Sequence, residues 1–348
     1  MKVASIVGAR PQFIKMAMLT KRLKNNPEME EIIIHTGQHY DRNMSKDFFN
    51  ELDIPEPDYY LDVVADKHGK QTAMMMVRIE KVLLEEMPDW VLVYGDTNST
   101  LAGVLTAAKL HLKTAHIEAG LRSYNRKMPE EIDRIVTDHI SDVLFAPTIN
   151  AMKILKNEGL GTRSYLVGDV MYDSVLYYAE LAEKKYKLSD IIPYPKYYLA
   201  TVHRQENTDD INRLKKIFDS FAKLDLPVVI PIHPRTNKYL KEINIDKNVK
   251  IINPTGYLQM LVLIRNAVKV LTDSGGVQKE AYFLQRPCIT LRDETEWIET
   301  LENGWNYTVG INDQLIFEKV KQTKTGQQKK YFGDGNAVDK IVEVLRKY

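Results

Sequence analysis

The chain has 348 residues, which is long enough for two domains of ordinary size. Its 48 Lys and Arg residues nearly balance its 47 Asp and Glu residues, so the net charge of +1 gives no electrostatic case for binding nucleic acid or an acidic membrane surface. No apolar run is long enough to span a membrane and no signal-peptide pattern is present, so we expect a cytoplasmic protein. A single cysteine, Cys288, cannot form an internal disulfide and is expected to be a buried thiol.

Short apolar runs alternate with helical patterns in the first half of the chain. The runs are rich in β-branched residues and carry few charges, as strands buried on both faces do. The predicted strands cover residues 3–7, 32–35, 90–94, 114–117, 143–146 and 165–167, and the predicted helices cover 13–23, 46–52, 71–86 and 100–110, with two more that begin near Pro129 and Ile149.

The same alternation continues in the second half, after a helix near 172–185 and a stretch with two prolines at 192–195. Predicted strands cover 197–202, 228–232, 249–252, 269–272, 288–291 and 306–309, and a terminal helix covers 337–347. Two halves of this kind predict an α/β protein with two Rossmann-like, doubly wound parallel sheets. Ligands of such sheets bind beyond the carboxyl ends of the strands.

The stretch from residue 268 to 280 carries the clearest binding pattern. An apolar run ends in Asp273 and Ser274, the pair Gly275-Gly276 follows, and a helical pattern begins at once. Glycines let an anion approach the backbone, and the free N–H groups and dipole of the helix attract it. Glu280 lies one to two turns into this helix, within reach of a ribose attached to a bound phosphate. By itself, the segment is equally typical of a capped strand-to-helix turn.

Two cations surround the start of the first predicted helix. Arg10 is suited to a bidentate contact with a phosphate, and Lys15 can reach the same place. Neither the G-x-G-x-x-G pattern of dinucleotide sites nor the G-x-x-x-x-G-K-[ST] pattern of triphosphate sites is present. A solvated loop is the alternative reading.

Carboxylates follow two strands and open one helix. Asp96 and Glu118 come directly after buried strands, and Glu130 opens the helix near residue 129. Carboxylates brought together at one edge of a sheet have pKa values that are pushed apart, as separate acid and base duties require. For the neighbouring Glu131 and Asp133 we favour an ordinary role in the first turn of a helix.

Histidines follow strands of the second half. His203 and His233 each come at a strand's carboxyl end, where an imidazole can donate to a phosphate or transfer a proton. A structural role is the alternative for each. His35 and His39 are separated by a glycine-containing loop and have no carboxylate at matching spacing, so we expect no metal site.

Together these patterns predict one ligand site to which both halves of the chain contribute side chains. The second half offers a phosphate site, and the first half offers carboxylates and cations that face it across a cleft. Such a site fits a nucleotide-sugar or another diphosphate, with Arg, His and helix N-termini in place of a metal ion.

These residues lie in motifs that resemble one known family along nearly the whole chain, the non-hydrolysing UDP-N-acetylglucosamine 2-epimerases. Many matches in the same order make the resemblance specific. The matching segments are Gly-Ala-Arg-Pro-Gln-Phe-Ile-Lys, Thr-Gly-Gln-His-Tyr-Asp, Gly-Asp-Thr-Asn-Ser-Thr, His-Ile-Glu-Ala-Gly-Leu-Arg, Met-Pro-Glu-Glu-Ile-Asp-Arg, Thr-Val-His-Arg-Gln-Glu-Asn and Thr-Asp-Ser-Gly-Gly-Val-Gln-Lys-Glu.

The resemblance implies a glycosyltransferase-B-like fold, in which two Rossmann-like domains face a cleft that holds the active site. The expected domains are an N-terminal one over 1–170, completed by a terminal helix at 336–348, and a UDP-binding one over 171–335. The resemblance also implies a UDP-sugar substrate, a homodimer, and neither a metal nor another cofactor.

The resemblance further implies an isomerase that works in two half-reactions. A proton leaves C2 while UDP leaves C1, which gives a bound glycal; a proton and UDP then add back with C2 inverted. Carried over by motif, the catalytic residues are Asp96, Glu118, Glu130 and His203, and the residues that bind substrate or UDP are Arg10, Lys15, Arg134, Ser274, Gly275, Gly276 and Glu280.

Two departures from the family pattern matter. Many members carry Arg-Asp-Thr-Thr-Glu-Arg-Pro-Glu after the phosphate site, whereas this chain has Trp297 in place of the second arginine. The loop after Gln38 has Tyr40-Asp41 where members regulated by a second UDP-N-acetylglucosamine place further polar ligands, which disfavours that regulatory site here.

The motifs resemble one subgroup most, which converts UDP-2,3-diacetamido-2,3-dideoxyglucuronate to its manno epimer for surface polysaccharides or glycans. The general UDP-N-acetylglucosamine 2-epimerases are the nearer alternative, and the hydrolysing 2-epimerases are another. A retaining glycosyltransferase of the same fold and a protein that only binds sugar nucleotides are more distant, because neither has a use for carboxylates beside C2.

Overall fold

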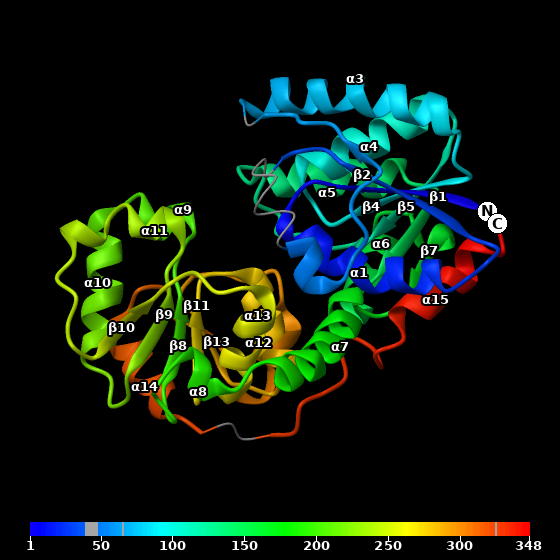
Figure 1. Cartoon of the computed structure of the whole chain (residues 1–348). Coiled ribbons are helices and arrows are strands. Elements are labelled where there is room, and N and C mark those ends of the chain that lie inside the picture. The colour runs from blue at the N-terminus through cyan, green and yellow to red at the C-terminus, as the bar shows by residue number, and fades with distance from the viewer. Residues whose placement is uncertain (39–47, 65, 324–325) are drawn as a thin grey trace. The chain divides into compact units, whose positions relative to one another are not determined.

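A computed structural model describes residues 1–38, 48–64, 66–323 and 326–348. The chain forms two compact units (Figure 1), one of Met1–Ser174 with Lys330–Tyr348 and the other of Val175–Lys329. Each unit is an α/β structure around one parallel sheet, as the alternating patterns predicted.

Within the described residues, the sheet of the first unit has seven parallel strands in the order β3-β2-β1-β4-β5-β6-β7. The predicted strands are confirmed, and the two-residue β3 is the one that the sequence did not indicate. The strands are β1 (Lys2–Val7), β2 (Glu30–His35), β3 (Tyr59–Tyr60), β4 (Trp90–Tyr94), β5 (Lys113–Ile117), β6 (Val143–Ala146) and β7 (Ser164–Leu166).

Helices α3 and α4 lie on one side of this sheet, and α1 and α15 lie on the other (Figure 1). The segment predicted as a helix over 46–52 is helical at 48–52, and its first two residues lie outside the described part of the chain. The helices are α1 (Arg10–Lys24), α3 (His68–Glu86), α4 (Asn98–Lys109), α5 (Pro129–Ile140), α6 (Ile149–Asn157) and α15 (Ala337–Leu345); α7 (Val170–Lys185) begins in this unit and continues into the second.

Helix α1 begins at Arg10, three residues before the sequence predicted. Gln12 is the reason, because its side-chain oxygen accepts from the backbone N–H groups of Gly8 and Ala9, at 2.8 and 3.0 Å. These contacts satisfy donors that a helix start leaves without a partner. Arg10 therefore lies in the first helical turn and not in a loop.

In the part of the second unit that the structure describes, six parallel strands form a sheet in the order β10-β9-β8-β11-β12-β13. Its elements are β8 (Tyr198–Thr201), β9 (Val228–Pro231), β10 (Val249–Ile252), β11 (Lys269–Thr272), β12 (Cys288–Thr290), β13 (Asn306–Thr308), α8 (Leu188–Ile191), α9 (Gln205–Thr208), α10 (Ile211–Ala222), α11 (Pro234–Asn237), α12 (Tyr257–Asn266), α13 (Gly275–Phe283) and α14 (Asp313–Lys321).

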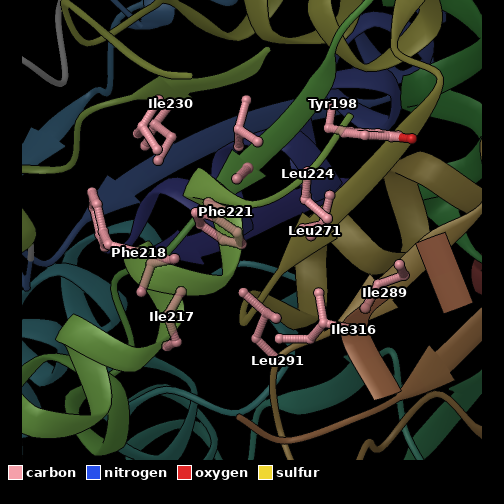
Figure 2. Close-up of a cluster of buried hydrophobic side chains, with 14 of the residues drawn as sticks. Tyr198, Ile217, Phe218, Phe221, Leu224, Ile230, Leu271, Ile289, Leu291 and Ile316 are labelled. Carbon is pink, nitrogen blue, oxygen red and sulfur yellow. The ribbon is translucent and has the colours of Figure 1, made fainter. Parts of the chain in front are cut away.

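One face of this second sheet packs on α10 and α14. Figure 2 shows side chains from both layers in one buried cluster, among them Leu271 of β11 and Phe221 of α10. Each of these two side chains is fully buried, and burial of a side chain of this size stabilises a fold by about 1.5–3 kcal/mol. The sheet is therefore a rigid support for the residues that follow its strands.

The order of the strands reverses once in each sheet. In the first sheet the reversal lies between β1 and β4, and in the second between β8 and β11. Ligands of doubly wound sheets bind at this point, beyond the carboxyl ends of the strands. The segments that begin with Gly8 and Gly95 in the first unit, and with Val202 and Asp273 in the second, follow these four strands.

Candidate active site

A buried ion pair lies at the end of β5 in the first unit. The ammonium nitrogen of Lys15, on α1, is 2.6 Å from a carboxylate oxygen of Glu118, and both side chains are almost fully buried. Gly95, with φ of +63°, leaves room for this ammonium, because a Cβ there would lie 2.8 Å from it. The sequence grouped Lys15 with Arg10 at an anion; the structure pairs it with the carboxylate of Glu118.

The backbone of Glu118 is strained. Its φ is +75°, which is rare for a residue with a side chain. The N–H groups of Glu118 and Ala119 both donate to the carbonyl of Phe145, on β6, and so hold the turn in this conformation. Strain of this kind is typical of functional sites, where the surrounding structure maintains it.

A second ion pair lies at the end of β4. Asp96 accepts a hydrogen bond from Arg134 of α5, and the guanidinium of Arg134 also contacts Glu131, at 3.1 Å. Glu131 in turn accepts from the backbone N–H groups of Ser123 and Tyr124, both at 2.8 Å. Glu131 therefore holds the loop before α5, and Arg134 lies buried between two carboxylates.

Asp133, on the same helix, is a further carboxyl of this group, and its pKa is raised. Burial raises the pKa of Asp133 to about 7, with help from the negative charges of Asp96 and Glu130 and against the positive charge of Arg134. Close carboxylates of this kind were predicted at these strand ends. The sequence assigned Asp133 only an ordinary place in the first helical turn and gave no sign of this environment.

Arg10 lies apart from these pairs. Its side chain is exposed, and its guanidinium lies 5.1 Å from the centre of the Phe48 ring. Glu130, at the start of α5, is half-buried, and its negative charge is close enough to Asp133 to raise the pKa of that carboxyl.

In the second unit, Asp273 ties together the two segments that follow β8 and β11. Its carboxylate accepts from the backbone N–H groups of His203 and Arg204, both at 2.9 Å, and from the side chain of Asn207, at 3.1 Å. The ring of His203 stacks on the ring of His233, with centres 4.9 Å apart. The two histidines that the sequence singled out are therefore neighbours.

Helix α13 begins beside this group. The hydroxyl of Ser274 caps it by accepting from the N–H of Val277, at 3.4 Å. Gly276 is half-buried and Glu280, further along the helix, is buried. At Gly275 a Cβ would lie only 2.4 Å from a carboxylate oxygen of Glu296, so a side chain there would have to displace this carboxylate.

Trp297, which replaces a cation of the family pattern, covers a buried lysine. The ammonium of Lys279 lies 3.9 Å from the centre of the Trp297 ring system, and both residues are buried. A cation over an indole face is a stabilising contact. The adjacent carboxylate of Glu296 pairs with Arg292, at 3.0 Å.

The position of Tyr40 and Asp41 lies outside the described residues. Among the described residues, no group of three or more His, Cys, Asp or Glu side chains is arranged to hold a metal ion. In the same part of the chain, no helix is both long and apolar enough to cross a bilayer.

Two doubly wound sheets, with polar side chains at both reversals of strand order, define a Rossmann-like α/β protein of the kind that binds nucleotides. The family model described as UDP-N-acetylglucosamine 2-epimerase matches residues 21–346. The chain therefore belongs to the UDP-N-acetylglucosamine 2-epimerase family, and its class is that of the isomerases.

Three similar proteins illustrate the match. A UDP-N-acetylglucosamine 2-epimerase homolog of Methanococcus maripaludis is 54% identical, over 99% of both chains. The UDP-2,3-diacetamido-2,3-dideoxy-D-glucuronate 2-epimerase of Pseudomonas aeruginosa is 48% identical over the full length of both. The solved structure of Methanocaldococcus jannaschii UDP-GlcNAc 2-epimerase in complex with UDP-GlcNAc and UDP is 44% identical, with a TM-score of 0.92 over the whole of both chains.

Proposed function

We propose that the protein inverts C2 of a UDP-sugar without releasing UDP and free sugar, and that its preferred substrate is UDP-2,3-diacetamido-2,3-dideoxyglucuronate. The buried pair of Lys15 and Glu118 beside Gly95 is the observation that carries the reaction type. A carboxylate that is held by a cation, on a strained turn next to a second carboxylate, suits proton transfer at a carbon atom.

In this proposal the first unit moves the C2 proton. Asp96 and Glu118 follow adjacent strands, and Glu130 opens the helix whose Arg134 holds Asp96. The ammonium of Lys15, 2.6 Å away, holds the carboxylate of Glu118 in place as the proposed base. Asp133, with its raised pKa, is suited to keeping a proton in the same group.

The second unit binds the nucleotide in this proposal. The N-terminus of α13, with Ser274, Gly275 and Gly276, has the free N–H groups and dipole that favour a phosphate. His203 contacts the diphosphate as its bond to C1 breaks, and Arg10 of the first unit does the same. Cations and backbone donors stabilise the charge that develops on a leaving UDP. Glu280 accepts from the ribose.

The substrate preference rests on the Pseudomonas aeruginosa relative, which resembles this chain over its full length and whose name gives the diacetamido-glucuronate. Trp297, which stands where many members have an arginine, is in keeping with this subgroup. The second candidate is UDP-N-acetylglucosamine itself, since the Methanocaldococcus jannaschii enzyme was solved with that sugar nucleotide and shares 44% of its residues with this chain.

Proton NMR in D2O tests the proposal, with each of the two UDP-sugars in a separate sample. We expect deuterium at C2 and a manno product with the uronate alone. Turnover of UDP-N-acetylglucosamine alone would overturn the preference and keep the reaction type. Release of UDP and free sugar in equal amounts would instead identify a hydrolysing enzyme, and no exchange at C2 without an acceptor would identify a glycosyltransferase or a binding protein.

We also propose that the protein is a homodimer in which α3 contacts the second copy. This helix exposes apolar side chains on one face, among them Val77 (64% exposed) and Leu84 (57% exposed). Residues seven apart lie on the same face of a helix. Light scattering of the wild type and of a Val77→Lys/Leu84→Lys variant tests this: a dimer that becomes a monomer supports it, and an unchanged mass overturns it.

A further inference from the structure

Asp138, on helix α5, links two loops of the first unit. One of its oxygens lies 2.7 Å from Nδ1 of His116, and Nε2 of the same imidazole donates to the carbonyl of Gly95, at 2.8 Å. Its other oxygen accepts from the backbone N–H of Gly120, at 3.1 Å. The side chains of Asp138 and His116 are both 0% exposed, so water does not compete for these contacts.

Each loop carries one of the carboxylates described above. Gly95 immediately precedes Asp96, and Gly120 lies two residues after Glu118. The chain of hydrogen bonds through Asp138 thus begins beside one carboxylate and ends beside the other. The main chain beside both carboxylates is therefore held by one connected pair of side chains, Asp138 and His116.

The partners of His116 fix the direction of its hydrogen bonds. A carbonyl oxygen can only accept a hydrogen bond, and an ionised carboxylate also only accepts, so His116 is the donor in both contacts. Burial acts to raise the pKa of Asp138, but the hydrogen bond from His116 and the positive charges of His116 and Arg122 outweigh it and lower that pKa. Asp138 is therefore ionised at neutral pH and can accept both contacts.

We propose that Asp138 and His116 are positioning residues of the reaction, which set the separation of Asp96 and Glu118 by holding the main chain at Gly95 and Gly120. Neither of the two touches the reacting atoms. The inference rests on the proposed function, because it concerns the two carboxylates that move the C2 proton. Errors of about 1 Å in the placement of such groups can lower a rate by about a hundredfold.

An isosteric variant separates the contacts from the charge. In Asp138→Asn, the amide nitrogen can donate to Nδ1 of a neutral His116, whose Nε2 still donates to Gly95. The amide oxygen can still accept from Gly120 and from Arg122, which lies 2.7 Å from the same oxygen of Asp138. The variant keeps every one of these hydrogen bonds and loses only the buried negative charge of Asp138. We therefore expect kcat to stay within about threefold of the wild type.

His116→Phe removes the hydrogen bond to the carbonyl of Gly95 and replaces the imidazole with another aromatic ring. We expect kcat to fall by about a hundredfold, with KM and the affinity for UDP within about threefold. If this variant does not fold, His116→Gln replaces it with the same expectation, because one amide nitrogen cannot serve both acceptors at the two ends of an imidazole. The matched control is Ile79→Ala, a fully buried position on α3 that should lower thermal stability and leave kcat unchanged.

The outcomes are distinct. A His116 variant with the kcat of the wild type overturns the inference. An Asp138→Asn variant whose kcat falls as far as that of the His116 variant also overturns it. A fall in kcat of Ile79→Ala that matches the His116 variant also overturns it, because general destabilisation would then account for the effect. Failure of the proposed function shows separately, as a wild-type protein that does not exchange the C2 proton with D2O.

Discussion

The strand ends of the two units are built from different kinds of contact. In the first unit, charged side chains hold one another, as Lys15 holds Glu118 and Arg134 holds Asp96. In the second unit, one carboxylate, Asp273, holds main-chain N–H groups, and a helix begins beside it with a serine cap. In the proposed function, the first arrangement fixes charges near the reacting carbon, and the second presents a backbone to an anion. We therefore expect substitutions in the first unit to affect rate and substitutions in the second to affect nucleotide affinity.

The largest effect is expected at Glu118. Glu118→Gln removes the proposed base and leaves Lys15 without its partner, so epimerisation should fall by about 10³-fold. Affinity for UDP, measured by calorimetry, should change far less. Glu31→Gln is the control, because Glu31 is a carboxyl of the same sheet that is bonded to Ser5 in β1 and lies near the amino end of β2, away from the carboxyl ends of the strands. Unaltered turnover in Glu118→Gln would remove this residue from the mechanism.

Asp133 gives a pH dependence to the stability of the first unit. Its pKa is about 7 in the folded protein, against an ordinary aspartate value of 3.8 in the unfolded chain, so the folded state binds the proton more tightly. The stability that this provides is complete below the unfolded pKa and is lost as the pH rises toward 7. The free energy of unfolding of Asp133→Asn should therefore rise relative to that of the wild type between pH 5 and pH 8, by up to about 3 kcal/mol. Urea unfolding at both pH values measures this, and a constant difference would contradict it.

Trp297 tests whether the second unit tolerates a cation at this position. Trp297→Arg would remove the indole face over Lys279 and place a second positive charge beside it, at a cost of about 2 kcal/mol in the free energy of unfolding. Trp297→Phe keeps an aromatic face and should cost less. The comparison is made by thermal denaturation; equal losses in the two variants would mean that packing, and not the cation–π contact, accounts for the effect.

The smallest effect is expected at Gly275. In Gly275→Ala the Cβ meets Glu296, which Arg292 holds in place, and it also covers the start of α13. We expect UDP to bind about tenfold more weakly, or about 1.4 kcal/mol, with bound substrate still exchanging its C2 proton at nearly the wild-type rate. Gly69→Ala on α3 is the control, since nothing lies near its Cβ position. If Gly275→Ala lost C2-proton exchange and kept its affinity for UDP, the expectation that the second unit governs affinity and the first unit governs rate would be wrong.

The sequence predicted the strands well because buried parallel strands are short apolar runs, and it predicted polar residues at their ends because such residues interrupt those runs. It missed β3, since two residues give no periodicity, and it began α1 too late because the capping role of Gln12 depends on a contact with Gly8. The sequence thus predicted where the strands end, but it did not predict the contacts that the residues at those ends make.

Contacts between distant residues explain what was missed at the site. Lys15 and Glu118 are 103 positions apart, and nothing local in either segment indicates the pair. His116 lies inside an apolar strand and Asp138 inside a helix, where each reads as an incidental polar residue. Only the fold brings the imidazole to the carboxylate, so a single sequence could not single out either.

The first unit is discontinuous in the sequence, and this has a consequence for its biosynthesis. Helix α15 packs on α1, and Asp173 accepts from the N–H of Val338 at 2.9 Å, so the last residues of the chain complete a core that the first residues begin. A ribosome makes residues 175–329 before it makes α15. The second unit can therefore finish folding while the first still exposes an apolar surface along α1, and this incomplete state is where we expect a nascent chain to need a chaperone.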